Sequence, residues 1–206
     1  MKKYLRIILI INFLFIKAVS AQKQSDQAQI DQIVKHIEAL QGDAYQIATY
    51  FSELDHQYLE RYGQTLFPYI KKEYDNLKVN KDLPLDLQFE VTFLLKNAYY
   101  VFGEHRKAAD LSYEMLSMAK QLNDSLYYYY AYSSIADIEI EIGNNESSLE
   151  LLLKAQKNAV IDTASLAQTY IDLAALYSAD HELQLVKENV TRGIELAKQA
   201  DDYFQV

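Results

Sequence analysis

Cysteine is absent from this chain, so no disulfide can stabilise the fold and no thiolate can bind a metal. Two prolines and five glycines are too few for an all-β chain, which needs many turns. Apolar residues nevertheless make up 50% of the sequence, and the chain is long enough to bury a core in one elongated domain. The composition therefore favours helices that are held together by core burial alone.

The residue patterns of common catalytic sites are also missing. The histidines lie at least 20 residues apart, too far to share a helix face as metal ligands: His36, His56, His105 and His181. No glycine-rich phosphate loop, nucleophile elbow or HExxH motif occurs. We therefore expect no metal, no cofactor and no enzymatic activity. A helical hydrolase with a scattered site is the alternative from another functional class.

The first 21 residues predict a secretory signal peptide. Basic residues at positions 2, 3 and 6 precede an apolar run over residues 7–16, and small residues form a cleavage site that ends at Ala21. The apolar run is about half as long as a membrane-spanning helix, so an uncleaved anchor is the alternative. We expect export to the periplasm or cell envelope, with cleavage near Ala21.

Basic residues are scarce, 20 against 29 acidic ones. Cleavage of the signal peptide would leave 16 basic residues against 29 acidic ones, a formal charge of −13. So acidic a surface repels nucleic acid and anionic membranes and favours basic or neutral partners. We expect neither nucleic-acid binding nor a membrane span in this sequence.

The clearest structural pattern is a helical hairpin between Asp124 and Asp162. Its first half carries apolar residues mostly at spacings of three and four, as on the buried stripe of a helix. Asp124 can cap the start of that helix, and Gly143 can adopt the left-handed conformation that closes its end. In the second half, Ser147 and Glu150 have the spacing of a capping box.

The hairpin recurs along the chain. Gly143 has a counterpart 40 residues earlier at Gly103, and the pair Ile135-Ala136 recurs 38 residues later as Leu173-Ala174. Units of about this length with two helices each are the signature of a solenoid. The sequence therefore predicts an all-α solenoid of antiparallel helical hairpins.

The repeating unit resembles the tetratricopeptide repeat (TPR) family, in its longer variant of about 40 residues from exported bacterial sensors. The family keeps small residues in both helices of each unit, met here by Ala136 and Ala174 in the first and by Ala155 and Gly193 in the second. Its tryptophan and its closing proline are missing here. The resemblance covers about residues 87–206 and implies a right-handed superhelix that binds other proteins.

We divide the chain into four segments: the signal peptide 1–21, a disordered polar lead 22–29, degenerate helical repeats 30–80, and TPR-like repeats 85–206 with an incomplete last repeat. Within 30–80 we expect helices over 30–40, 44–62 and 64–77, with Pro68 tolerated only near the first turn of the third. Exported arrays of this family often precede a membrane span and an output domain. The alternative is therefore that the chain is the extracytoplasmic sensor half of a membrane-bound transcriptional regulator or histidine kinase.

The family resemblance implies that the first helix of each hairpin lines an inner, concave wall. Carried over residue by residue, the two later units contribute Tyr130, Ser133, Asp137, Ile140, Glu141, Gln168, Ile171, Ala175, Ser178 and Ala179. The preceding unit contributes Glu90, Phe93, Asn97, Tyr100 and Val101, with Lys96 where a small residue belongs. Acids and aromatics thus replace the lysine, arginine and asparagine with which the family binds acidic C-termini. We expect a basic or apolar segment of a protein or peptide partner.

Tyrosine is unusually frequent, with 18 residues and a run over 127–130. Consecutive helical positions point about 100° apart, so all four cannot face the core. Either Tyr129 packs while the others rest their rings on neighbours with the hydroxyl in water, or some of them line the inner wall.

Two turns carry an aspartate followed by a hydroxyl residue, Ser125 in one and Thr163 in the other. Both resemble the acceptor of a general bacterial O-glycosylation system. Helix capping is the alternative explanation for the same residues. The leading hypothesis is a non-enzymatic protein-binding module within an envelope signalling or scaffolding assembly.

Overall fold

The computed structural model describes residues 27–40, 43–53, 57–79, 83–159, 163–179 and 181–203. Within these residues the regular structure is helical and contains no strand. A helical stretch over residues 27–39 is followed by α2 (Ala44–Glu53), α3 (Gln57–Val79), α4 (Leu85–Val101), α5 (His105–Leu122), α6 (Ser125–Glu141), α7 (Asn145–Asn158), α8 (Thr163–Ala179) and α9 (Leu183–Tyr203).

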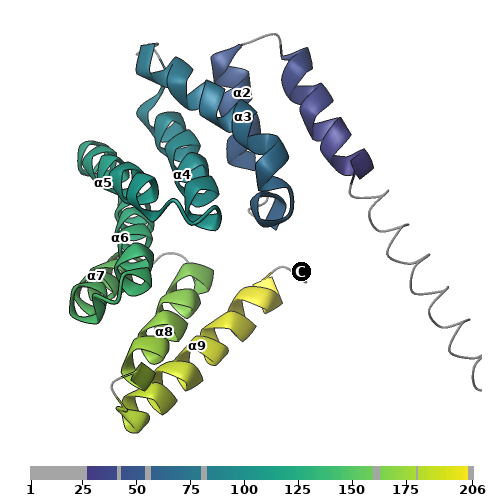
Figure 1. Ribbon diagram of the computed structural model, residues 1–206. Helices are drawn as coiled ribbons and strands as arrows, with labels where there is room; N and C mark the ends of the chain where they lie inside the picture. Colours follow the sequence, from purple (N-terminus) through teal and green to yellow (C-terminus); the bar gives the residue numbers. More distant parts are fainter. Residues whose placement is uncertain are drawn as a thin grey trace, which may run out of the picture.

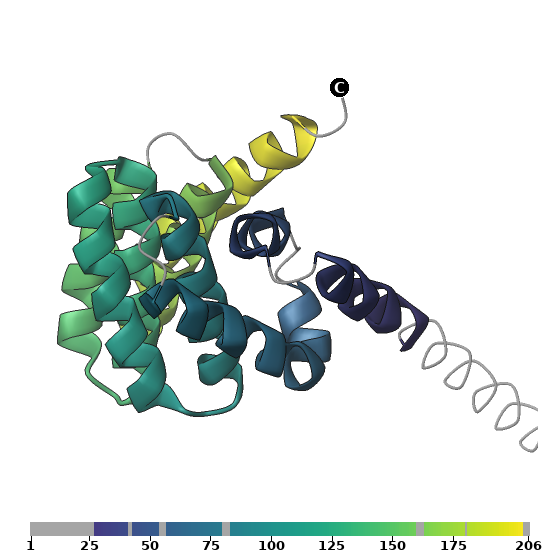
Figure 2. The ribbon, with the colours of Figure 1, turned by 90° about the horizontal axis from the view of Figure 1, so that it is seen from above.

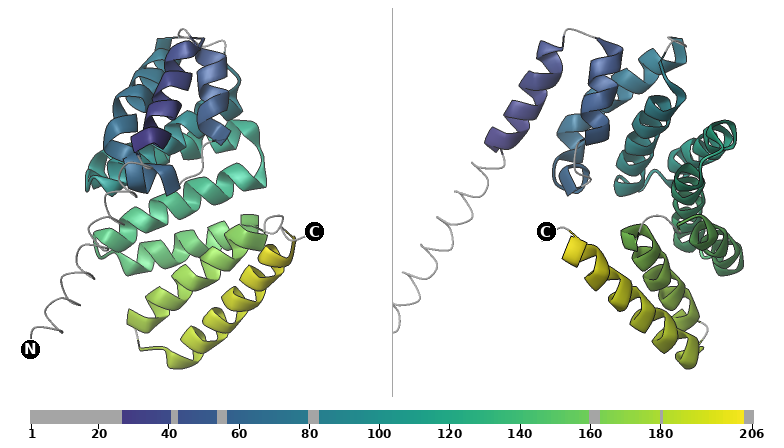
Figure 3. Two further views of the ribbon diagram at one scale, coloured as in Figure 1. Left: turned by 90° about the vertical axis from the view of Figure 1, so that its right-hand side faces the viewer. Right: turned by 180° about the vertical axis from the view of Figure 1, so that it is seen from behind.

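Successive helices pack on one another, and α4–α5, α6–α7 and α8–α9 form antiparallel hairpins. The helices follow an arc that runs from residues 27–39 through α5, α6 and α7 and returns with α8 and α9 (Figures 1 and 3). Seen from above, α4 to α8 stack on one side of the molecule, and the stretch 27–39 lies on the other (Figure 2). The protein is an all-α helical repeat solenoid, as the sequence predicts.

The corners of the hairpins repeat the same backbone geometry. Gly103 and Gly143 have φ angles of 73° and 79°, the left-handed conformation that a residue without Cβ adopts at least cost. The amide after each glycine donates to a carbonyl five residues earlier, from Glu104 to Tyr99 and from Asn144 to Glu139. The sequence did not predict the third corner, where His181 adopts a φ of 61° in place of glycine.

Small side chains allow the two helices of a hairpin to approach closely. Ala136 and Ser148 are fully buried at the contact of α6 and α7. The Ser148 hydroxyl donates to the Ala136 carbonyl at 3.1 Å, which joins the helices through a group that would otherwise be buried without a partner. Ala155, another small position predicted from the repeat pattern, is equally buried, as is Ala108 of α5.

The N-terminal region differs from the prediction in its helix limits. Residues 27–29, assigned to a disordered lead, belong to the first helical stretch. The break that we expected at Gly63, between the helices 44–62 and 64–77, is absent, because Gly63 lies inside α3. Pro68 also lies in the interior of this helix. The expectation that Pro68 requires a first turn is therefore wrong. Pro68 is exposed, while Leu66 and Ile70 on either side are buried in the core, and that burial offsets a proline cost of about 3 kcal/mol.

The capping predictions for α6 and α7 have different outcomes. The Asp124 carboxylate accepts a hydrogen bond from the Leu126 amide at 2.8 Å and caps α6 as predicted. The capping box of Ser147 and Glu150 is wrong, because α7 begins at Asn145 and both residues lie inside the helix. Asn144 is the N-cap residue, but its side chain does not cap the helix. The side-chain amide of Asn144 donates instead to the carboxylate of Glu139 at 2.7 Å.

The predicted signal peptide lies outside the described residues. Within the part of the chain that the structure describes, no helix is both long enough and apolar enough to cross a membrane.

Candidate binding surface on the concave wall

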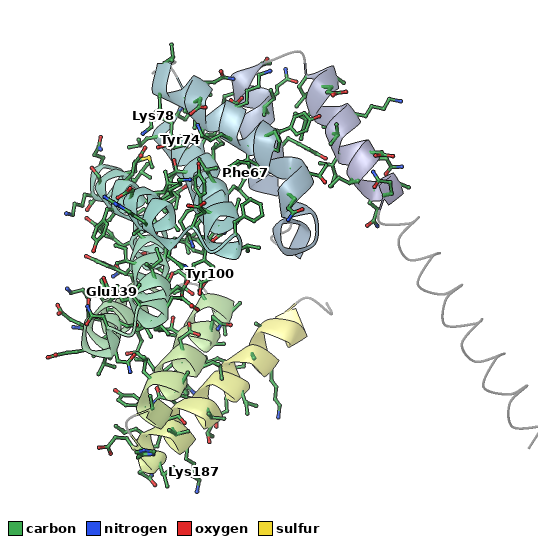
Figure 4. The ribbon with its side chains drawn as sticks, viewed as in Figure 1. Phe67, Tyr74, Lys78, Tyr100, Glu139 and Lys187 are labelled. Carbon is green, nitrogen blue, oxygen red and sulfur yellow. The ribbon has the colours of Figure 1, made fainter. Side chains whose placement is uncertain are left out.

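The predicted inner wall is carried by α4, α6 and α8, which lie on the inside of the arc, with α5 and α7 on its outside (Figures 1 and 3). Tyr100, on the last turn of α4, marks the place where these three helices approach one another (Figure 4). Its hydroxyl donates to Glu141 of α6 at 3.1 Å. Burial raises the pKa of Tyr100 to about 12, and Glu141, Asp137 and, from α8, Asp172 add to the rise. Side chains from three repeat units therefore meet at this wall.

Aromatic rings join α4 to α6 at one end of the wall. The ring centroids of Phe93 and Tyr130 are 5.3 Å apart, and those of Phe89 and Tyr127 are 4.8 Å apart. Beside them opens a hollow of about 410 Å³, which we call the aromatic–acidic hollow. Its lining consists of Asp86, Leu87, Glu90, Phe93, Leu126, Tyr127 and Tyr130.

The charge in the aromatic–acidic hollow is negative. Desolvation, reinforced by the neighbouring Asp86 carboxylate, raises the pKa of Glu90 from 4.5 to about 7. Burial and the same two carboxylates raise the pKa of the Tyr127 hydroxyl. A cation placed here would relieve the repulsion between the carboxylates and could rest on a tyrosine ring. The hollow therefore has the chemistry to accept a basic side chain.

A group of buried and half-buried charges lies further along the wall. Lys96 is only 4% exposed, and its ammonium lies 4.9 Å from the centre of the Phe93 ring. Burial lowers the pKa of Lys96 to about 8, against the attraction of Asp137. Burial also raises the pKa of Asp137 to about 6; Lys96 opposes this shift, whereas Asp172 and Glu141 reinforce it. Asp172 has a raised pKa for the same reason, desolvation.

Two further predicted residues, Ser133 and Ile140, have partners close by in the structure. The Ser133 hydroxyl donates to the Tyr130 carbonyl of its own helix at 3.2 Å. Ile140 packs on the apolar cluster of Ala136, Leu152, Leu173 and Leu176, so it contributes to the core as well as to the wall. Asn97 is half-buried on α4.

Gln168 and Ile171 lie in a separate hollow of about 250 Å³ between α8 and α9. The Gln168 amide donates to Asp172 at 2.8 Å, which links this hollow to the charged group around Asp137. Ile171 is 40% exposed and lies against Gly193, where a Cβ would come within 2.8 Å of its Cδ1. The predicted residues thus form two neighbouring surfaces rather than one continuous lining.

The run of four tyrosines contains both kinds of environment that the sequence allowed. Tyr129 is 5% exposed and donates to the Ser165 carbonyl at 3.1 Å, so it belongs to the core. Tyr128 stacks on Tyr132 with centroids 6.0 Å apart. Tyr127 and Tyr130 are half-buried and line the aromatic–acidic hollow.

Several residues of this surface were not predicted. Asp86 and Tyr127 line the hollow without belonging to the positions carried over from the repeat pattern. Asp172 lies next to Ile171 and interacts with Asp137. Asp86 and Glu90 stand four residues apart, so they share one face of α4, and that spacing was the available signal.

The two predicted acceptor residues are each the first residue of a helix. Ser125 begins α6 and Thr163 begins α8, and both are half-buried. Capping by the preceding aspartate is present at Asp124, while Asp162 lies outside the described residues. Glycosylation of Ser125 and Thr163 stays a prediction.

The fold is similar to that in a crystal structure of BtubC (BKLC) from P. vanneervenii. The TM-score is 0.57 at 14% sequence identity, over 85% of this chain and 69% of that chain. At this identity the similarity concerns the fold alone. No family model matches the chain, and no curated protein matches it. Within the described residues, no group of three or more histidine, aspartate or glutamate side chains could hold a metal ion.

Proposed function

We propose that this protein is a non-enzymatic binding module whose concave wall holds a basic or apolar segment of a partner protein. The observation that carries the proposal is the aromatic–acidic hollow, in which Asp86 and Glu90 stand beside the rings of Phe93, Tyr127 and Tyr130. Carboxylates beside aromatic faces favour lysine and arginine side chains. The resemblance to the TPR family, in which the inner wall binds extended segments, supports the same role.

The charged group around Asp137 extends this surface towards α8. Asp172 and Glu141 both act electrostatically on Asp137, with Lys96 as the opposing cation. Three carboxylates against one ammonium leave this part of the wall negative. A segment that lies along the wall would therefore meet negative charge in the hollow and again beside Asp137.

The proposal is tested with a pair of short labelled peptides, one alternating lysine and leucine and the other glutamate and leucine. We expect the basic peptide to bind about tenfold or more tightly than the acidic one by fluorescence anisotropy. The double variant Asp86→Asn, Glu90→Gln keeps the shape of the hollow and removes its charge, so it should lose most of that preference. These isosteric changes are preferable to truncating Tyr130, which packs against buried apolar clusters.

The matched control is Asp110→Asn, Glu146→Gln. It makes the same change in net charge on α5 and α7, where both residues are exposed and away from the hollow. The control should keep the wild-type preference. Equal binding of both peptides by the wild-type protein, or an equal loss in the control and in the hollow variant, would contradict the proposal.

Export belongs to the same proposal, because the predicted leader would direct the module to the cell envelope. Expression in a Gram-negative host should yield a protein whose intact mass corresponds to a chain that begins directly after Ala21. A product that retains all 206 residues in the cytoplasmic fraction would contradict export.

A further inference from the structure

A cavity of about 320 Å³ lies at the N-terminal side of the arc, apart from the concave wall. It is bordered by the helical stretch 27–39, α2 and α3, and its lining consists of Ile37, Glu38, Ile47, Tyr69, Lys72, Glu73 and Asn76. This volume is at the lower end of the range for small-molecule sites in proteins. None of these residues belongs to the predicted inner wall.

Glu73 is the unusual residue of this cavity. It is only 2% exposed, and one carboxylate oxygen, Oε2, accepts a hydrogen bond from the Asn76 amide at 3.2 Å. Among the residues that the structure describes, the other oxygen, Oε1, has no hydrogen-bond partner although it is buried. Buried carboxylates in folded proteins are paired, because an unpaired one is strongly disfavoured. Oε1 is therefore an acceptor without a donor.

The groups around Glu73 carry more negative than positive charge. Glu38 reaches the cavity from the stretch 27–39 and accepts a hydrogen bond from the Tyr69 hydroxyl at 3.3 Å. Desolvation raises the pKa of Glu73, and Asp43 adds to the rise; the Asn76 hydrogen bond and Lys72 oppose it. Three carboxylates thus act here against one ammonium, which disfavours an anionic ligand.

The remaining walls are hydrocarbon. Ile37 and Ile47 are 6% exposed each and face the cavity from two different helices. A ligand that fits must therefore combine an apolar body with a cationic hydrogen-bond donor.

We propose that this cavity binds a small primary amine: a rotation of the Glu73 side chain brings the buried Oε1 to the ammonium, while the hydrocarbon part packs against Ile37 and Ile47. The ammonium supplies the donor that Oε1 lacks and balances the excess of negative charge. A neutral alcohol of the same length could fill the space and donate one hydrogen bond, but it carries no charge. The site thus selects for the amine.

The test titrates the isotope-labelled full chain with n-hexylamine, 1-hexanol and hexanoate at neutral pH and follows amide and methyl signals by NMR. We expect the amine to shift signals of Ile37, Ile47 and the residues around Glu73, with an affinity roughly tenfold or more above that of the alcohol and no binding of hexanoate. Equal affinity for amine and alcohol, or no saturable shift with the amine, would overturn the proposal without any variant.

Two variants locate the interaction. Glu73→Gln keeps the size of the side chain and removes its charge, so amine binding should fall roughly ten- to a hundredfold to the level of the alcohol. Asp75→Asn, an exposed acid on the same helix that pairs with Lys71, makes the same charge change outside the cavity and should leave binding unchanged. Amine binding that survives Glu73→Gln, or that falls equally in Asp75→Asn, would show that Glu73 is not the acceptor and would overturn the proposal.

Discussion

Lys96 occupies the position at which the two later repeat units carry Ala136 and Ala174. Its long side chain reaches over the Phe93 ring and brings an ammonium into the field of Asp137, on the neighbouring hairpin. A pattern of small residues predicts that this position is buried, which is correct. It does not predict the charge interaction, because Lys96 and Asp137 are 41 positions apart and meet only through the stacking of two units.

Replacing Lys96 with methionine should raise the pKa of Asp137. In the wild-type protein, burial, Asp172 and Glu141 raise the pKa of Asp137 and the Lys96 ammonium lowers it, with a net value of about 6. Without the ammonium we expect the pKa of Asp137 to rise further, because the cation that lowers it is gone. Carboxyl signals of Asp137 followed by NMR over a pH series measure the change. Lys107→Met, at an exposed ammonium on α5, is the control and should leave Asp137 unaffected; an unchanged pKa in the Lys96 variant would contradict the interaction.

Glu90→Gln should stabilise the protein at high pH but not at low pH. The pKa of Glu90 is raised to about 7 in the folded state, so the fold favours the protonated form. This contribution is fully present below the ordinary pKa of 4.5 and is lost as the pH rises through 7. The free energy of unfolding of the variant should exceed that of the wild type by about 1–3 kcal/mol at pH 8 and by little at pH 4.5.

Urea denaturation at the two pH values measures this difference. Glu146→Gln, on an exposed turn of α7, should show no such pH dependence. A Glu90 variant that is less stable than the wild type at pH 8 would contradict the assignment of a desolvated carboxylate to the hollow.

At the scale of single elements, the sequence predicts helices where periodicity and turn residues agree. The α6–α7 hairpin was predicted because its apolar spacing, Asp124 and Gly143 all indicate the same limits. The break predicted at Gly63 was wrong, because tertiary burial of Leu66 and Ile70 maintains α3 through both glycine and proline. His181 gave no turn signal, although its corner has the geometry of the other two.

The corners provide a direct test of repeat equivalence. At both Gly103 and Gly143 an added Cβ would meet no atom within 4 Å, so an alanine there introduces only backbone strain. Gly103→Ala and Gly143→Ala should each lower the free energy of unfolding by about 1 kcal/mol, and by the same amount within error. Thermal and urea denaturation of the two variants measure this. A large cost at one corner and none at the other would show that the two turns are not equivalent.

At the scale of the whole molecule, the helices from α3 to α9 contact mainly their neighbours along the chain, while α2 packs on α4 more than on α3, so stability should vary along the arc. Sequence periodicity predicts this stacking, because each unit repeats the same local pattern of apolar and small residues. It does not predict the cavity at Glu73, because Glu38, Asp43 and Glu73 come together only where the N-terminal helices pack. Surfaces that form only where separate units pack together, such as the cavity at Glu73, therefore cannot be predicted from the sequence pattern.

A core substitution near one end of the arc should loosen only that end. Leu176 is buried in the cluster that joins α6, α7 and α8, and Leu176→Ala should cost about 2–4 kcal/mol locally. We expect hydrogen exchange to accelerate in α8 and α9 and to remain unchanged over residues 27–39 and in α2. The reciprocal variant, Ile33→Ala, should accelerate exchange at the N-terminal side and leave α9 unchanged, because Ile33 packs in a separate cluster. Uniform acceleration over the chain in either variant would mean that the helices unfold as one cooperative unit, and the nearest-neighbour description of the solenoid would be wrong.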